Sequence, residues 1–382
     1  MSDHESPHAL TVARLDEEAF ANLADEWCRL LERSGADPLF MGWPWLYSWW
    51  ETWGEQLGLE LHLYAAYDAG QELVGLAPFF AHRFRSPVGI TLNRLHFLGN
   101  AWRIQPTVRT EYCGVIAEQG REASVIEAIL AEVSRVPWHE LVVCDQGIRE
   151  LLQWQEAFDR LGQRVTTVPR SMDSGVRVQV SGDFREWLNS LGRNTRLKAF
   201  NRRGYLHERG RLDCRDLSAR ESTQFLEQLN RFHEQRWGKP CFDEQPLAFH
   251  EALIQRLPAG NAHLSVLEFE DEPISALYDV RAGRTRYNLQ LGFNEQFDRK
   301  VAPGTLHLGY AIEESFRDTT IDAFDMLAGR GKKSFYKSHF QGEQVHFLTV
   351  QFVRHPLMRW IYRIQSWLPG RLRQSINRFV RL

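Results

Sequence analysis

Residues Phe324–Phe340, FDMLAGRGKKSFYKSHF, bring together glycines, lysines and serines, which are residue types that bind phosphate groups. A nucleotide-binding P-loop requires a glycine, four further residues, and then Gly-Lys-Ser or Gly-Lys-Thr, because successive backbone N–H groups wrap the phosphates. Here Met326 stands where the first glycine belongs, and Lys333 follows Gly331-Lys332. The segment is therefore not a P-loop, and its lysines and Tyr336 need either an anionic partner or a solvated surface.

A second basic run lies between Asn189 and Arg209, where we expect one helix. Residues 193–211 carry seven basic residues against a single acid. Acids that would pair with them at i to i+4 are nearly absent, so an anion-binding face explains the run better than a plain solvated face does. The guanidinium groups that could grip a phosphate or carboxylate are those of Arg193, Arg196 and Arg203. Nucleic acid is not expected as a partner, because stacking aromatics are sparse in this helix and the whole chain is acidic.

The composition is that of an ordinary globular protein with two domains. The chain has 382 residues, of which 43% are hydrophobic and 25% charged, and its formal net charge is −3. A chain of this length exceeds one ordinary core. The five cysteines form no Cys-x-x-Cys pair, which argues against a disulfide framework and a structural zinc site, so we expect no metal. The N-terminus is polar and no apolar stretch reaches spanning length, which favours a cytoplasmic protein.

The C-terminal residues 352–382 differ from the rest of the chain. Residues 344–382 contain seven arginines and no acid. Tryptophan, isoleucine and leucine are interleaved with these arginines, and Pro369-Gly370 divides the segment into two short helices. We expect a basic amphipathic tail that contacts an anionic membrane surface, which would place the protein at the periphery of the inner membrane. The alternative is a helix packed on the second domain with its arginines in solvent.

The order of the expected elements repeats along the chain. Residues 61–80 and 263–281 both predict strand, polar turn and strand, and a helix precedes each pair. A further strand, a helix and a short apolar strand follow each pair. The repetition indicates two α/β (α+β) domains, each a mixed, mostly antiparallel sheet flanked by helices. We place these domains at residues 1–170 and 171–351, ahead of the tail.

Several of these segments, in this order, resemble the CelD-like acetyltransferases, which carry tandem GNAT (Gcn5-related N-acetyltransferase) folds and are related to the FemABX peptidoglycan aminoacyl transferases. The segments of the first half are PLFMGWPWLYSWWETWG, VGLAPFFAHR and TEYCGVIA. Those of the second half are LGRNTRLKAFNRRGYLHERG, FHEQRWG, APGTLHLGYAIEES and FDMLAGRGKKSFYKSHF. The resemblance spans residues 35–350 and implies acyl transfer from acetyl-CoA or another acyl-CoA, but it names no acceptor.

The resemblance also implies a site for the acyl-CoA pyrophosphate in the segment RKVAPGT. The GNAT pattern is Gln/Arg-x-x-Gly-x-Gly/Ala ahead of a helix, whose N-terminus adds positive potential. Arg299, Ala302, Gly304 and Thr305 occupy the matching positions. Ala302 replaces the first glycine, and Pro303 lacks an N–H group, so this cradle is thinner than usual. The alternative is that the segment only begins an amphipathic helix.

Amide formation needs a base for the acceptor amine and a directed donor for the oxyanion. Among the residues that carry the resemblance, Asp325, Tyr336 and His233 are the candidates for these catalytic roles. Arg236 and Lys337 join the arginines of the basic helix as candidate substrate contacts. Alternatively, Asp325 bonds the glycine turn after its strand, His233 is a packing residue, and the lysines only keep a surface loop soluble.

Taken together, these features predict a GNAT-type N-acyltransferase whose second domain is catalytic. Its acceptor is expected to be an anionic amine, small or carbohydrate-linked, such as an envelope or exopolysaccharide precursor. The first domain is expected to be non-catalytic, because no counterpart of Arg299 and Gly304 precedes Glu122. Two alternatives stay open. One is aminoacyl transfer of the FemABX type, against which the lack of an obvious long coiled-coil arm argues, and the other is a non-catalytic, membrane-associated scaffold of a polysaccharide system.

Overall fold

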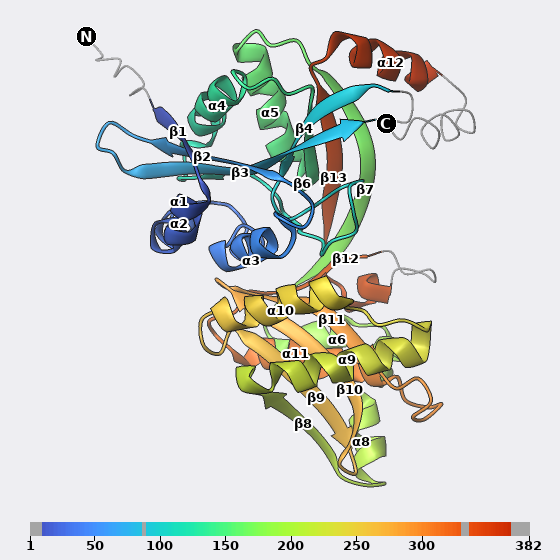
Figure 1. Ribbon diagram of the computed structural model, residues 1–382. Coiled ribbons are helices and arrows are strands. Elements are labelled where there is room, and N and C mark those ends of the chain that lie inside the picture. The colour runs from blue at the N-terminus through green and yellow to red at the C-terminus, as the bar shows by residue number, and fades with distance from the viewer. Residues whose placement is uncertain (1–9, 86–88, 330–335, 368–382) are drawn as a thin grey trace. The chain divides into compact units, whose positions relative to one another are not determined.

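Two similar sets of strands organise the chain in the computed structural model, which describes residues 10–85, 89–329 and 336–367 (Figure 1). Residues 1–172 together with 346–382 form one compact unit, and residues 173–345 form another. We call them the first and the second unit. The domain boundaries expected from the sequence, between residues 170 and 171 and between residues 351 and 352, stay a prediction.

The sheet of the first unit runs in the order β1-β2-β3-β4-β6-β13. Its strands are β1 (Thr11–Leu15), β2 (Glu60–Tyr67), β3 (Leu73–Arg85), β4 (Thr91–Phe97), β6 (Glu140–Gln146) and β13 (Glu343–Val353), of which the residues from His346 belong to this unit. The short β5 (Ile116–Ala117) pairs with β3. Neighbouring strands are antiparallel except β4 and β6, which pair in parallel through Arg94–His96 and Glu140–Val142. A parallel pair requires a crossover connection, and it contains helix α4 (Glu122–Val133).

Helices cover both faces of this sheet (Figure 1). They are α1 (Glu17–Asn22), α2 (Ala24–Glu32), α3 (Trp43–Trp53), α4, α5 (Ile148–Arg160) and α12 (Pro356–Trp367). Successive residues of a strand point to opposite faces. Accordingly, Phe80 of β3 stacks on Trp49 of α3 with ring centroids 5.5 Å apart, whereas Phe79 meets Trp154 of α5 at 6.2 Å. The aromatic-rich helix expected from the sequence is therefore α3, and it fills one side of this core.

The second unit repeats the arrangement with the strand order β8-β9-β10-β11-β12-β7. Its strands are β8 (Leu212–Leu217), β9 (Ala262–Phe269), β10 (Glu272–Ala282), β11 (Thr285–Phe293), β12 (Ala323–Ala328) and β7 (Thr166–Gln179), of which the residues from Asp173 belong to this unit. Of these described strands, β11 and β12 alone pair in parallel, and α11 (Pro303–Arg317) lies in their crossover. The mixed, mostly antiparallel sheet that the sequence predicted for each half is confirmed.

The two faces of this second sheet carry different helices. On β10, Ser275 and Leu277 point toward α11, whereas Tyr278 packs against α9 (Ser222–Trp237) and α10 (Glu244–Arg256). Figure 1 shows α9 and α10 side by side across the sheet of this unit. The α11 face is closed further by α6 (Phe184–Ser190) and by the basic run, whose Ala199 and Phe200 share a core cluster with Leu308.

The basic run does not form the single helix expected over 189–209. It consists of α7 (Arg193–Arg196), the π-helical turn η1 (Leu197–Asn201) and α8 (Arg202–His207). Leu191 and Gly192 are extended and separate the run from α6, because the buried Leu191 side chain is drawn into the core. The π-turn places η1 directly against α11.

The contact between η1 and α11 depends on the absence of a side chain at Gly309. A Cβ atom at this position would overlap the carbonyl oxygen of Ala199. We expect Gly309→Val to lower the free energy of unfolding of the second unit by about 1 to 3 kcal/mol or more, as overpacking of a core does. Gly204 of α8 has no atom within 4 Å of such a Cβ, so Gly204→Ala should stabilise by about 0.5 to 1 kcal/mol through helix propensity. Equal effects of the two substitutions in urea denaturation would contradict the close contact.

Candidate functional site

The parallel strands β11 and β12 part soon after they meet. They pair through Thr285–Tyr287 and Ala323–Asp325, and both strands lie wholly within the described residues, which contain no further pair between them. Past Asp325 the backbone of β12 is irregular, with Leu327 in the left-handed region at φ 57°. The remainder of β11, up to Phe293, therefore has backbone groups that β12 does not use.

Helix α11 begins beside this unpaired end of β11. Ala302 is its N-cap residue and Pro303 its first residue, and no side chain caps the helix. A Cβ at Gly304 would lie 2.6 Å from Cδ1 of Phe293, so the glycine allows the helix to start against the strand. The N–H groups of Gly304 and Thr305 precede the first intrahelical hydrogen bond, which Leu306 N makes to Ala302 O at 2.9 Å. The first N–H groups of the helix, which have no intrahelical partner, thus lie beside the end of β11.

The end of α9 reaches the same part of β11 from the other face of the sheet. Nε2 of His233 donates to the carbonyl oxygen of Leu291 at 3.1 Å, which leaves the lone pair on Nδ1. Burial lowers the pKa of His233 below its ordinary value, so the ring is neutral at pH 7. The guanidinium of Arg236 stacks on Phe293 at 4.6 Å and pairs with Glu295 at 2.5 Å. The segments Leu291–Phe293, Ala302–Thr305 and the pair His233 and Arg236 are called the β11-end site below.

Tyr336 lies within electrostatic range of this site. Desolvation raises the pKa of its phenol, while the charge of Arg236 acts in the opposite direction. The residue as a whole is 40% exposed. The structure therefore brings His233 and Arg236 to the end of β11 beside the predicted donor segment, and it places Tyr336 within range of the Arg236 charge.

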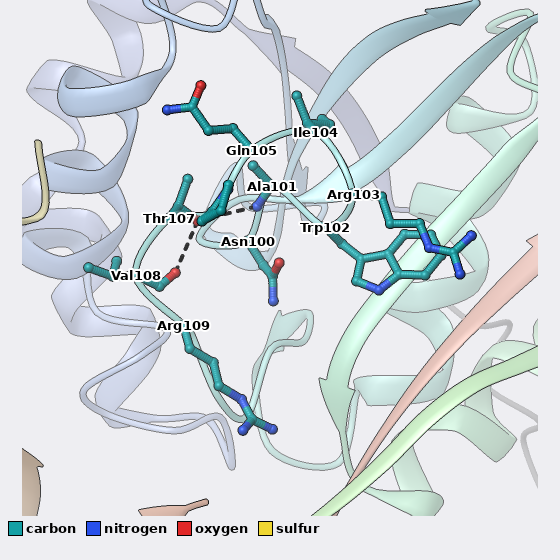
Figure 2. Close-up of a pocket in the computed structure, with 10 residues that line it drawn as sticks. Asn100, Ala101, Trp102, Arg103, Ile104, Gln105, Thr107, Val108 and Arg109 are labelled. Atoms are coloured by element: carbon teal, nitrogen blue, oxygen red, sulfur yellow. Dashed lines mark hydrogen bonds between the residues drawn. The ribbon is translucent and has the colours of Figure 1, made fainter. Parts of the chain in front are cut away.

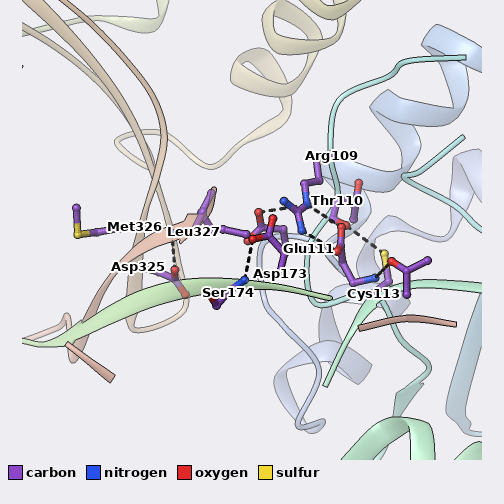
Figure 3. Close-up of polar contacts among 12 residues, drawn as sticks. Arg109, Thr110, Glu111, Cys113, Asp173, Ser174, Asp325, Met326 and Leu327 are labelled. Atoms are coloured by element: carbon purple, nitrogen blue, oxygen red, sulfur yellow. Dashed lines mark hydrogen bonds and ion pairs between the residues drawn. The ribbon is translucent and has the colours of Figure 1, made fainter. Parts of the chain in front are cut away.

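Asp325 is placed differently, because its carboxylate is occupied within the second unit. It is fully buried, and Arg177 of β7 donates to Oδ2 at 3.0 Å. Oδ1 accepts the backbone N–H of Leu327 at 2.8 Å (Figure 3). These contacts match the structural alternative, in which the aspartate holds the turn after its strand.

Lys337 also contacts the end of β12. It belongs to the short helix η3 (Tyr336–Phe340), and its Nζ donates to the carbonyl oxygens of Met326, Leu327 and Ala328 at 2.5, 2.8 and 3.2 Å. The ammonium group thus donates hydrogen bonds to carbonyl groups that the left-handed backbone conformation of Leu327 turns out of the sheet. The Arg330–Phe335 part of the segment lies outside the described residues.

The three arginines of the basic run have unequal environments. Arg203 is paired with Glu313 of α11 and lies 3.6 Å from the ring centroid of Tyr310, so much of its charge serves the contact between α8 and α11. Arg196 donates to the carbonyl oxygen of Asn189 at 3.2 Å. The Arg193 side chain is exposed. Arg299, in the predicted donor segment, is likewise exposed.

A buried polar chain that the sequence did not indicate fixes α11 to the sheet. His307 is fully buried, and its two ring nitrogens lie 3.0 Å from the hydroxyls of Ser275 and Ser265. Ser275 donates in turn to the carbonyl oxygen of Gly292 at 3.0 Å, in the β11-end site. Burial lowers the pKa of His307 to about 3, so the ring stays neutral. The only sequence signal was a histidine on the apolar face of the predicted helix.

The first unit contains an open pocket made by one segment. Residues 100–109 line a volume of about 410 Å³ (Figure 2). Arg109 at its edge is paired with Asp145, with two nitrogen–oxygen distances of 2.8 Å. No predicted site residue lies in this pocket. Throughout the described parts of the chain, no group of three or more His, Cys, Asp or Glu residues is placed to hold a metal ion.

Residues 193–338 match a family model described as the acetyltransferase (GNAT) domain. This region contains α9, β11, α11, β12 and hence the whole β11-end site. The GNAT-type acetyltransferase domain that the sequence predicted in the second half is confirmed. No curated protein sequence matches the chain.

Solved structures extend the likeness in fold to most of the chain. A crystal structure of FemX superposes with a TM-score of 0.58 at 12% identity, covering 88% of this chain and 96% of FemX. A conserved protein of unknown function from Bacteroides thetaiotaomicron gives 0.53 at 9% identity, over 90% of this chain and 99% of its own. L-PGS from Bacillus licheniformis gives 0.50 at 12% identity, over 95% and 97%. At these identities the likeness concerns the fold alone.

Proposed function

We propose that the second unit transfers an acyl group from acyl-CoA to an amine acceptor. The observation that carries this proposal is the coincidence of the GNAT match with the β11-end site, where α11 begins beside parted parallel strands. N-acyl transfer follows from the domain type. The use of CoA, the nature of the acceptor and the roles of single residues are the proposed part.

The donor's pyrophosphate would lie against the start of α11. The N–H groups of Gly304 and Thr305 have no intrahelical partner, and they point along a helix axis whose N-terminal end carries positive potential. Pro303 contributes no N–H, so the exposed Arg299 side chain would supply part of the neutralising charge. Gly304 supports this arrangement indirectly, since its close contact with Phe293 holds the helix start at the strand.

His233 of the β11-end site and Tyr336 near it would carry out the proton transfers of the reaction. The amine nitrogen attacks the thioester carbonyl carbon, a C–N bond forms, and the C–S bond breaks as the tetrahedral intermediate collapses. Nδ1 of His233 would accept the proton that the amine loses, because Nε2 is held as a donor by Leu291 O. The neutral phenol of Tyr336 would give a proton to the departing thiolate and regain one from solvent. The products are an amide and free CoA.

We further propose an anionic amine as the acceptor, within a CelD-like role on an envelope or exopolysaccharide precursor. Arg193 is exposed, and the single hydrogen bond of Arg196 to a backbone oxygen leaves its charge without a paired acid among the contacts of the described residues. Arg203 is assigned a supporting role, because Glu313 already pairs with it.

The first unit is proposed to be non-catalytic. Its α4 occupies the position of α11, but Arg121 is the N-cap residue and an acid, Glu122, stands in the first turn. An acid at this position repels a phosphate group. The first unit would therefore serve as a structural partner of the catalytic one.

Aminoacyl transfer is the second candidate, and the likeness in fold to FemX over 88% of the chain favours it. It differs from the first candidate in the donor, since it does not require CoA. A membrane-associated scaffold without catalysis is the third. Binding of CoA distinguishes the first candidate from the other two.

The first experiment measures thermal unfolding of the full chain with acetyl-CoA, longer acyl-CoAs and bare CoA. A ligand that binds only the folded state stabilises it by about 2.7 kcal/mol at a hundred times its Kd. We expect stabilisation by CoA species and about tenfold weaker binding by Arg299→Gln, since one charge-assisted contact is lost. Arg220→Gln removes another exposed arginine of the second unit and serves as the control. Absence of any shift with CoA species would reject CoA as the donor.

The second experiment separates the two candidate bases. His233→Gln should lower kcat/KM by about 10²- to 10⁴-fold with little loss of stability, because a general base contributes that range. Since the pKa of His233 is lowered, kcat/KM of the wild type should be level above pH 6.5 and fall at a lower pH, as the ring becomes protonated. Asp325→Asn should instead lower stability through the loss of its contact with Arg177, with activity per folded molecule retained. The opposite pattern would make Asp325 the base.

The third experiment tests the acceptor. Amines with and without a phosphate or carboxylate group are compared at saturating donor, with the wild type and the Arg193→Gln/Arg196→Gln variant. We expect the variant to raise KM for anionic amines roughly tenfold or more, because charged contacts are lost, and to leave KM for the donor unchanged. Equal KM values of the two proteins for anionic amines would mean that the basic run is only a solvated surface.

A further inference from the structure

Helix α12 is fixed to the first unit by one of its faces. Met358 and Tyr362 are buried in a cluster with Leu92 and Val353. The Tyr362 hydroxyl also donates to Oε1 of the buried Glu140 at 2.8 Å. The sequence-based alternative, a helix packed on the second domain, therefore named the wrong partner, since this face of α12 packs on the first unit. Truncation before α12 would expose this core, so the helix is best probed by point substitutions.

The Glu140 carboxylate makes the attachment specific. Its Oε2 accepts Nε of Arg94 at 2.6 Å and Nε2 of Gln351 at 2.5 Å. Together with Tyr362, three groups from β4, β13 and α12 converge on one buried acid. These contacts fix the rotation of α12 about its own axis and therefore determine which of its residues face outward.

The outer face of α12 is apolar. At about 100° per residue, Leu357, Trp360, Ile364 and Trp367 fall within one sector of about 80°. Their side chains are exposed by 49%, 63%, 41% and 85%. The helix thus has two apolar faces, of which packing uses only one. We call the exposed one the outer stripe.

Basic residues border the outer stripe. Arg359 and Arg363 lie between it and the buried face on one side of the helix. After Trp367 the sequence contains four more arginines and no acid. No described helix is long and apolar enough to cross a bilayer. Tryptophan and leucine beside arginine are the residues of a helix that lies in a membrane interface.

We propose that the outer stripe of α12 inserts into the headgroup region of an anionic phospholipid bilayer, with Arg359 and Arg363 at the lipid phosphates. The proposal is independent of the catalytic function proposed for the second unit. Charge complementarity selects this occupant, since the segment from α12 to the C-terminus is basic throughout. A second copy of the chain fits less well, because it would bring the same arginines against each other.

The test is sedimentation of the full chain with vesicles of phosphatidylcholine, with and without phosphatidylglycerol. We expect binding to vesicles that contain phosphatidylglycerol at low ionic strength and weaker binding as salt is added. Trp360→Ala/Ile364→Ser/Trp367→Ala should weaken binding at least tenfold, because buried apolar side chains are lost. Arg359→Gln/Arg363→Gln should weaken it about fivefold for each arginine.

Ile148→Ser/Leu152→Ser provides the matched control, since both side chains are 58% exposed on α5 of the same unit. It should bind vesicles as the wild type does, and all variants should keep the wild-type unfolding midpoint. Failure of the wild type to bind anionic vesicles, or equal loss in the control and the stripe variant, would overturn the proposal. A wild-type dimer that the stripe variant converts to monomer in size-exclusion chromatography would instead assign the stripe to a second copy.

Discussion

The close approach of helix α11 to its neighbours is the constraint on which the second unit depends. At Gly304 the helix touches the end of β11, and at Gly309 it touches the backbone of η1. A side chain at either position would push the helix away. Because both contacts lie on one helix, they set its position along its axis as well as its distance from the sheet. The N–H groups of its first turn, which have no intrahelical partner, therefore stand at the end of β11, and His307 meets Ser275 and Ser265 beneath them.

The architecture could be predicted from the sequence because the hydrophobic periodicity of each segment and the order of the segments can be read directly along the chain. The strand–turn–strand segments at 61–80 and 263–281 became β2–β3 and β9–β10, and the helix after each became the crossover of a parallel pair. The prediction of one continuous basic helix over 189–209 was wrong, because the pattern of charges does not indicate the break at Leu191 and Gly192. The chain breaks there because the Leu191 side chain is buried in the core.

The candidate site was accessible only in part, because the sequence shows which groups are present but not which partners they have. Asp325 and Lys337 looked available for chemistry, yet Arg177 and the carbonyls of β12 occupy them. Arg203 looked unpaired because its acid, Glu313, is distant in sequence. His233 and Arg236 were selected by resemblance, and their common contact with the end of β11 emerged from the fold. The roles of all these residues in catalysis remain predictions.

The convergence of three donors on Glu140 has a consequence for substitution at that position. Glutamine has almost the same shape as glutamate, but one of its terminal atoms is a donor. In the first unit every neighbour that reaches Glu140 is itself a donor: Arg94, Gln351 and Tyr362. An amide nitrogen in the place of Oε1 would require the Tyr362 hydroxyl to turn and accept, and it would leave the buried Arg94 charge without its paired acid. The position is therefore selective for negative charge rather than for size, since a carboxylate both accepts from all three neighbours and neutralises Arg94.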